Sequence, residues 1–246
     1  MDIGEIFTAA NLIGLVTLVA LEVVLGIDNI IFMAIQVEKL PPEQRERARK
    51  LGLMAAGGMR IILLLFIGLL MKLTADVFTI MGHGISGKDM VLIAGGGYLL
   101  WHSVKEIHEK VKGHTHIPGG KLRPAATFGR VLLSILMIDL VFSIDSVLTA
   151  IGMVKSIAVM VIAILISVGV MLLASGAVIR FIQKHKTVQI LALAFLVLIG
   201  VLLVAEGFEQ HVSKGYVYAA VIFASAVEFL QIRADQHAHQ SEPRPS

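Results

Sequence analysis

The chain contains repeated apolar runs of about 17–25 residues, and this length constrains its fold more than any other feature. A run of this length crosses the hydrocarbon core of a bilayer as one helix. Transmembrane β-barrels alternate apolar and polar residues instead, and these runs do not alternate. The sequence therefore predicts an all-α, polytopic membrane protein. We expect seven transmembrane helices, at about residues 12–36, 51–73, 87–105, 131–153, 157–179, 188–205 and 216–232.

The composition agrees with this class and excludes several others. Hydrophobic residues make up 57% of the chain and charged residues 16%, against roughly 25% charge in an ordinary soluble domain. The pI of 9.2 does not indicate a nucleic-acid partner, because the basic residues lie in short loops between the apolar runs. The absence of cysteine excludes thiolate metal ligands. The first residues lack the basic segment of a cleavable signal peptide, so we expect none.

The charges of the loops predict the orientation. Sixteen Lys and Arg residues lie in the loops after the first, third and fifth spans and in the tail, and four lie in the other loops. Cytoplasmic loops carry the excess of Lys and Arg. We therefore expect the N-terminus outside and the C-terminus in the cytoplasm, in the inner membrane of a bacterium.

The sequence contains an internal repeat. "EVVLGIDN" (Glu22–Asn29) is matched 117 residues later by "DLVFSIDS" (Asp139–Ser146). The first span runs inward and the fourth outward, so the two halves form an inverted repeat, which is typical of secondary transporters. We expect a first repeat (1–105), a cytoplasmic linker that contains histidines (106–130), a second repeat (131–205), and a seventh span with a cytoplasmic tail (206–246).

Four acids stand inside the repeated spans: Glu22, Asp28, Asp139 and Asp145. An ionised carboxylate in the bilayer interior costs at least ~2.5–3.5 kcal/mol, so each acid must be protonated, paired or bound to a cation. Six residues of ideal helix turn through about 600° and advance ~9 Å, so one straight helix cannot direct both of its acids at one ion. Either the helices break near Gly26 and Ser143, or each acid meets a partner on the other repeat.

The inverted symmetry pairs Glu22 with Asp139 and Asp28 with Asp145. Glu22 and Asp139 fall near the centres of their spans, with Asp28 toward the cytoplasm and Asp145 toward the outside. A central pair with one acid on each side fits alternating access. A deep break would instead bring all four acids together, and hydrogen bonds between protonated acids would need no ion.

The residues beside the acids supply further oxygen ligands, from the Asn29 amide and the Ser143 and Ser146 hydroxyls. An all-oxygen set suits Mg²⁺, Ca²⁺ or Mn²⁺ rather than copper or zinc, and the residues alone do not choose among the three. Glu228, in the seventh span, is a candidate for an access path, with an interfacial acid as the alternative.

Arg60 is the one base deep within a predicted span. We interpret it as an internal counter-charge that pairs with the acids when a metal ion leaves; the alternative is an arginine that extends to the membrane interface. One divalent ion and Arg60 supply +3 against −4 from the acids. Protonation of the acids on metal release therefore predicts proton–metal antiport.

Histidines cluster around the linker and in the tail. They are His102, His108, His114 and His116, with His237 and His239. Clustered histidines can bind metal, but the spacing is irregular, and a polar soluble loop is the better interpretation.

The motifs "ExxLGxDN" and "DxxFSxDS" resemble those of the TerC family of integral membrane proteins, which looks related to the LysE-type exporters. The resemblance covers nearly the whole chain. It implies export of divalent cations, with Mn²⁺ the best-supported substrate. We expect no prosthetic group.

Two other classes of function are alternatives to export. An intramembrane aspartyl protease also uses two membrane aspartates, but the "GxGD" motif is absent, and we do not expect an enzyme. The remaining alternative is a non-transporting membrane component of tellurite or envelope-stress resistance.

Overall fold

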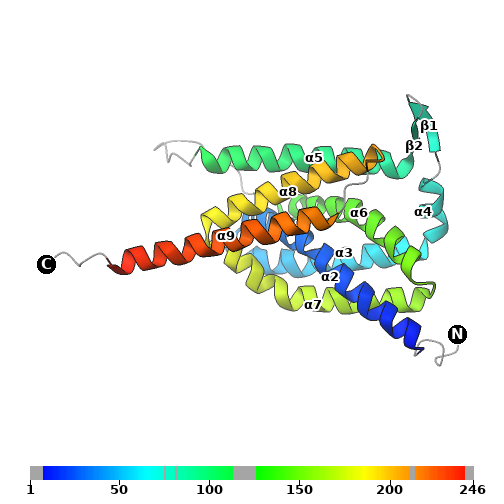
Figure 1. Cartoon of the computed structure of the whole chain (residues 1–246), viewed down its shortest axis with the longest axis horizontal. Coiled ribbons are helices and arrows are strands. Elements are labelled where there is room, and N and C mark those ends of the chain that lie inside the picture. The colour runs from blue at the N-terminus through cyan, green and yellow to red at the C-terminus, as the bar shows by residue number, and fades with distance from the viewer. Residues whose placement is uncertain (1–7, 75, 81–82, 113–125, 211–213, 242–246) are drawn as a thin grey trace.

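Long helices that run alongside one another form the bundle in Figure 1, a computed structural model that describes residues 8–74, 76–80, 83–112, 126–210 and 214–241. The helices are α2 (Ala9–Glu38), α3 (Pro42–Leu65), α4 (Ile67–Leu73), α5 (Gly87–Val111), α6 (Phe128–Met153), α7 (Ile157–Lys184), α8 (Lys186–Gly207) and α9 (Lys214–Ser241). The all-α class fits. The described residues also contain an antiparallel hairpin of β1 (Asp76–Ile80) and β2 (His83–Ser86), which was not predicted.

Five of the described helices are long and apolar enough to cross a membrane: α2, α6, α7, α8 and α9. The predicted spans at 51–73 and 87–105 fall on less apolar helices, because α3 begins with several charged residues and α5 carries charge at both ends. The expectation of one continuous helix over 51–73 was wrong. The helix ends at Leu65, and Phe66, with φ −92° and ψ 31°, separates α3 from α4. The count of seven crossings stays a prediction.

The long helices pack in pairs, and each pair joins one helix of the first half of the chain to one of the second half. α2 packs against α7, α3 against α6, and α5 against α8. In an inverted repeat, α2 corresponds to α6, α3 to α7 and α5 to α8. The pair of α2 and α7 then corresponds to the pair of α6 and α3, and α5 packs against its own counterpart, α8. Asp89 of α5 approaches Gly207 of α8 and Gly96 approaches Gly200, so these two helices run antiparallel. An inverted repeat would produce this pattern.

Glycines let α5 and α8 come into backbone contact. A Cβ atom at Gly96 would lie 2.8 Å from the Gly200 carbonyl oxygen, and one at Gly200 would lie 2.8 Å from Leu100 Cγ. The next residue, Gly97, faces open space, with nothing within 4 Å of a Cβ atom. Small residues that allow close backbone approach are typical of helix pairs in membranes.

We expect Gly96→Ala to destabilise the protein and Gly97→Ala not to. The added methyl at Gly96 meets backbone that cannot turn aside, and overpacking of this kind costs about 1–3 kcal/mol. The result would be a midpoint of thermal unfolding in detergent lower by roughly 2–12 °C. Gly97→Ala is the matched control, since it makes the same chemical change in the same helix. Equal midpoints for the two variants would contradict the close contact.

The apolar core lies in two parts, with a polar layer between them. One part includes Ile30, Leu53 and Ile138, and the other includes Leu18 and Leu64. In α2 and α3 the residues between these positions include buried charged side chains. The two apolar parts therefore enclose the candidate site described below.

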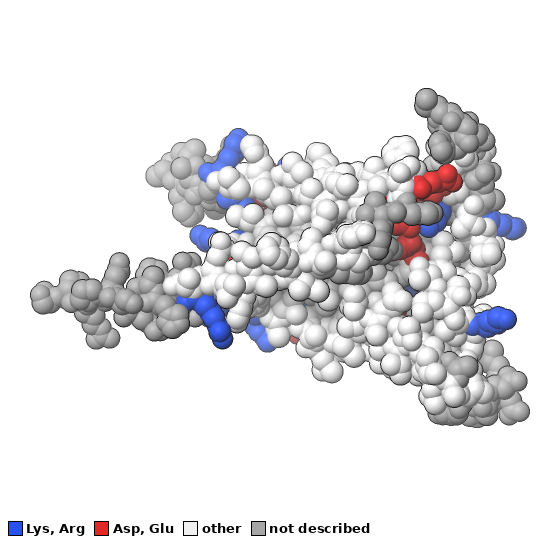
Figure 2. Space-filling view, in the orientation of Figure 1, with Lys and Arg blue, Asp and Glu red and all other residues white. Residues whose placement is uncertain are grey.

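The two ends of the bundle differ. α2 begins at the end that carries β1 and β2, here called the hairpin end, and α9 extends past the opposite end (Figure 1). α9 continues to Ser241, beyond the predicted limit of the seventh span at residue 232. The face drawn in Figure 2 is mostly uncharged, and its basic side chains lie near the two ends. This distribution suits a surface in contact with lipid, because charge is costly in the hydrocarbon core.

Candidate functional site

Arg60 joins the two repeated motifs in the middle of the bundle. It lies on α3, is 2% exposed, and points its guanidinium at residues of α2 and α6. Nη1 donates to Glu22 Oε2, Nη2 lies 3.1 Å from Asp139 Oδ1, and Nε lies 3.2 Å from Ser143 Oγ. The expected pair, Glu22 and Asp139, is thus brought together through one buried arginine.

Asp139 receives two further hydrogen bonds. The Asn29 amide donates to Oδ1 at 2.8 Å, and the Ser143 hydroxyl donates to Oδ2 at 3.0 Å. Ser143 therefore accepts from Arg60 and donates to the aspartate. The Asn29 carbonyl oxygen is buried and has no hydrogen-bond partner among the described residues. Such an orphan acceptor is uncommon in a folded core, where most buried polar atoms are paired.

Both motif helices are continuous, and this corrects one of the two expected geometries. α2 runs unbroken through Gly26, and α6 runs unbroken through Ser143. A Cβ atom at Gly26 would lie 2.4 Å from Met171 Sδ, so this glycine allows α2 to pack against α7 and does not break the helix. Asp139 accordingly meets Arg60 and Asn29 of the other repeat, whereas Glu22 pairs with Arg60 of its own repeat.

Asp28 and Asp145 line a cavity of about 60 Å³ that also reaches Arg60 and Ser146. Its remaining wall comes largely from α8, including Leu203 and Glu206. Both aspartates line this one cavity, and their expected placement on opposite sides of the central pair stays a prediction. The Ser146 hydroxyl donates to the Ser143 carbonyl oxygen at 3.4 Å.

Two charged residues at this cavity were not among the predicted site residues. Lys88 Nζ, at the start of α5, lies 3.7 Å from Asp145 Oδ1 and 3.4 Å from Glu206 Oε1. The close packing of α5 on α8 brings these residues together, and the "GGG" of residues 95–97 was the available signal for that packing.

Glu228 and the histidines lie apart from the site. Glu228, on α9, accepts a hydrogen bond from the Thr187 hydroxyl at the start of α8, the opposite end of that helix from Glu206, and its access role stays a prediction. His102 and His108 lie within α5 and not in a loop. The His102 ring stacks on Tyr98, 5.8 Å between centroids. His114 and His116 lie outside the described residues, and of the tail histidines only the helical backbone is described.

A separate polar network closes the bundle at the end opposite the hairpin. Lys110 Nζ lies 3.2 Å from Glu38 Oε2 and donates to Gln189 Oε1 at 2.6 Å. Lys39 pairs with Glu106 at 2.9 Å. These contacts tie the end of α2 to α5 and α8, whereas the cavity lies toward the other ends of α5 and α8.

The site is a charge cluster in a transmembrane bundle. Glu22, Asp139 and Arg60 together carry a net charge of −1, and Asp28 and Asp145 add to it. Within the described part of the chain, no three Asp, Glu or His side chains are grouped closely enough to hold a metal ion. In this arrangement Arg60 occupies the position between the carboxylates.

Apolar helices of membrane length around a buried, charged cluster define a polytopic, transporter-like membrane protein. The chain matches the model of the integral membrane protein TerC family over residues 7–242, and it belongs to that family. Its relatives are named as inner membrane proteins, and the chain is a multi-pass protein of that membrane.

Curated relatives resemble the chain over most of its length. UPF0053 inner membrane protein YoaE of Escherichia coli K12 is 47% identical over 93% of the chain, which spans only 44% of YoaE. UPF0053 inner membrane protein YgdQ of the same strain is 44% identical, over 88% of the chain and 90% of YgdQ. A UPF0053 protein of Haemophilus influenzae is 47% identical, over 90% of the chain and 93% of that protein. No solved structure matches the chain at a significant level.

Proposed function

We propose that this protein is a secondary transporter that exports divalent cations, with Mn²⁺ as the foremost substrate, in exchange for protons. The observation that carries the proposal is Arg60, buried between Glu22 and Asp139 and bordering the cavity of Asp28 and Asp145. A permanent ion pair for structural purposes would need one carboxylate. The repeated motifs supply four.

The chemistry of the cluster favours a hard cation. Its ligands would be the four carboxylates, the hydroxyls of Ser143 and Ser146, and the carbonyl oxygen of Asn29, which lacks a partner in the Arg60-paired state. Oxygen sets of this kind suit Mn²⁺, Ca²⁺ and Mg²⁺. The preference for Mn²⁺ and the outward direction rest on the resemblance to the TerC family.

Arg60 and the metal ion are proposed to alternate. A guanidinium between Glu22 and Asp139 excludes a divalent ion from the same carboxylates, both by volume and by charge repulsion. Loading therefore requires Arg60 to withdraw and α2 and α6 to shift until more of the acids converge. When the ion is released, Arg60 returns to Glu22 and Asp139. Protons that bind to Asp28 and Asp145 then replace the positive charge of the ion.

The two ends of the bundle fit alternating access. The cavity approaches Arg60 from the hairpin side, and the network around Lys110 closes the other side. With the predicted orientation, the cavity opens toward the outside. Opening the Lys110 network and closing the cavity would expose the same acids to the cytoplasm, as the inverted repeat permits.

The test is ion flux in proteoliposomes. Purified protein would be reconstituted around a pH-sensitive dye and a Mn²⁺ reporter, and Mn²⁺, Ca²⁺ and Mg²⁺ would be added in turn. We expect Mn²⁺ uptake together with a rise in internal pH, since each entering ion drives protons out. Protein-free liposomes and added proton ionophore are the controls.

Each outcome decides one part of the proposal. Mn²⁺ flux with no pH change would overturn proton coupling and leave a divalent cation transporter. Flux of Ca²⁺ or Mg²⁺ alone would overturn the choice of Mn²⁺. No flux of any of the three, in protein shown to be folded, would overturn transport and favour a non-transporting component of tellurite or envelope-stress resistance.

A further inference from the structure

Lys88 lies where an ion would pass between solvent and the buried acids. Its ammonium bridges Asp145 of α6 and Glu206 of α8, at 3.7 and 3.4 Å. Both carboxylates line the cavity that reaches Arg60. Exposure falls along this route, from 22% for the side chains of Lys88 and Glu206 to 14% for Asp145 and 3% for Arg60. The lysine thus stands on the solvent side of the cavity.

The position of Lys88 in its own helix calls for an explanation. It is in the first turn of α5, where the macrodipole disfavours positive charge and favours negative charge. Its neighbour Asp89 fits that rule, because its carboxylate caps Ser86 in a capping box. Lys88 contributes nothing of this kind to the helix. What it contacts is the pair of cavity carboxylates.

Lys88 and Glu206 belong to one packed unit, and Asp145 to another. Gly207 brings α8 against α5, since a Cβ atom there would lie 2.9 Å from the Asp89 carbonyl oxygen. If α6 shifts relative to this unit, Lys88 is therefore expected to stay beside Glu206. The contact to Asp145 is the longer of the two and lies beyond hydrogen-bonding distance, so it is the one that a movement of α6 breaks first.

We propose that Lys88 is a gating residue, a tethered cation that competes with the transported divalent ion for Asp145 and Glu206 at the hairpin end of the cavity. This inference rests on the proposed function. When the ion occupies the cavity, its double charge displaces the ammonium; when Lys88 returns, it repels the ion into solvent. With the hairpin end outside, Lys88 promotes release on the exit side. Arg60 would perform the same exchange at the central pair.

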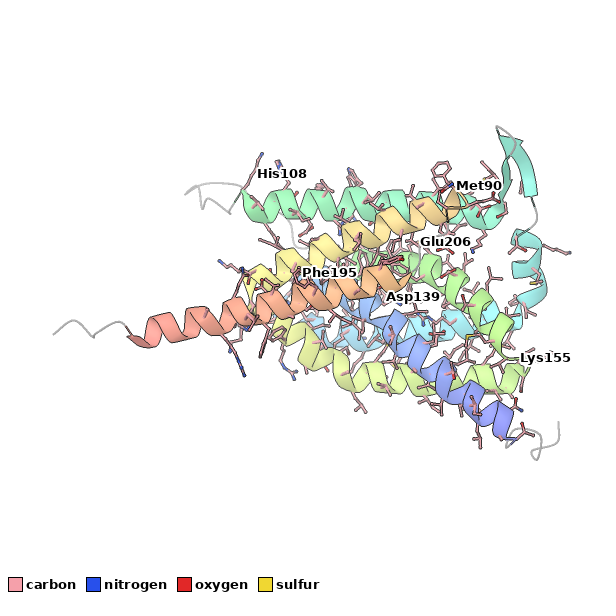
Figure 3. All side chains as sticks on the ribbon, viewed as in Figure 1. Met90, His108, Asp139, Lys155, Phe195 and Glu206 are labelled. Carbon is pink, nitrogen blue, oxygen red and sulfur yellow. The ribbon has the colours of Figure 1, made fainter. Side chains whose placement is uncertain are left out.

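The chain contains no cysteine, so the charge at position 88 can be set by modifying a single introduced cysteine. Lys88→Cys would be the only cysteine in the chain. A methanethiosulfonate reagent with a trimethylammonium group adds a positive charge there, and one with a sulfonate group adds a negative charge. Lys155→Cys, at an exposed residue toward the same end of the bundle (Figure 3), is the matched control.

The measurement is equilibrium binding of Mn²⁺ to purified protein, with thermal unfolding as the check on folding. We expect Lys88→Cys to bind Mn²⁺ about threefold to tenfold more tightly than the wild type, because a nearby like charge is removed. Modification with the ammonium reagent should restore the wild-type affinity, and the sulfonate should tighten binding further. A merely structural lysine would not give this order, since both reagents add bulk.

The results separate this inference from the proposed function. Equal Mn²⁺ affinity in all three charge states of Lys88→Cys, in protein that binds Mn²⁺, would overturn the gate and leave the transporter. The same graded response in Lys155→Cys would also overturn it, since any surface charge would then suffice. A wild type that neither binds nor transports a divalent ion would refute the proposed function first.

Discussion

Replacing Arg60 with methionine is expected to destabilise the protein by about 3–5 kcal/mol and to abolish transport. Methionine fills much of the same volume but leaves Glu22 and Asp139 buried without a counter-charge, and removal of one partner from a buried ion pair typically costs this much. For a chain of this size the midpoint of thermal unfolding should fall by roughly 6–20 °C. Arg180→Met, at an exposed arginine, is the control.

A triple variant separates the structural from the functional part of this effect. Arg60→Met combined with Glu22→Gln and Asp139→Asn removes all three charges of the central ion pairs, and replacing a complete buried ion pair is often neutral or stabilising. We expect the unfolding midpoint to return to within a few degrees of the wild type, while divalent cation flux stays absent. Flux in the triple variant would show that the central cluster is structural. An unchanged midpoint in Arg60→Met alone would contradict the burial of its partners.

The central part of the site could be predicted from the sequence. Glu22 and Asp139 fall near the centres of two opposed spans with matching motifs, and a carboxylate in an apolar span needs a partner. Arg60 was the one base deep within a span, so its pairing with Glu22 and Asp139 followed from electrostatics. The continuity of α2 did not follow in this way, because Gly26 is compatible with a break as well as with the contact it makes to Met171.

The cavity and its gate could not be predicted in the same way. Lys88 and Glu206 are 118 residues apart, and only the packing of α5 on α8 brings them together. No rule of local sequence pairs a residue in the first turn of one helix with a residue in the last turn of another. The interruption at Phe66 also had no local signal, since neither proline nor glycine stands at that position. The hairpin did have one, because β-branched residues alternate in "DVFTI" before a glycine.

Asp28→Asn is expected to reduce Mn²⁺ flux by at least on the order of 100-fold while the protein stays folded. The side chain is half-buried and lines the cavity, and Arg60 keeps its ion pairs with Glu22 and Asp139 when the Asp28 charge is removed. Asparagine keeps the volume and one carbonyl oxygen and removes the negative charge. Mutation of a residue that only supports a metal ligand lowers metal affinity or activity about 10–100-fold, and mutation of a ligand itself should lower it more.

Glu43→Gln is the matched control, because it also removes one negative charge, at an exposed position in the first turn of α3. We expect it to transport as the wild type does, and both variants to unfold within about 3 °C of it. Asp145→Asn should resemble Asp28→Asn, because the inverted repeat makes the two aspartates equivalent and both line the same cavity. If Asp28→Asn transports normally and Asp145→Asn does not, the two aspartates have different roles. The ion would then pass along the Asp145 side of the cavity alone. This outcome would contradict equivalent roles for the two repeated motifs in transport.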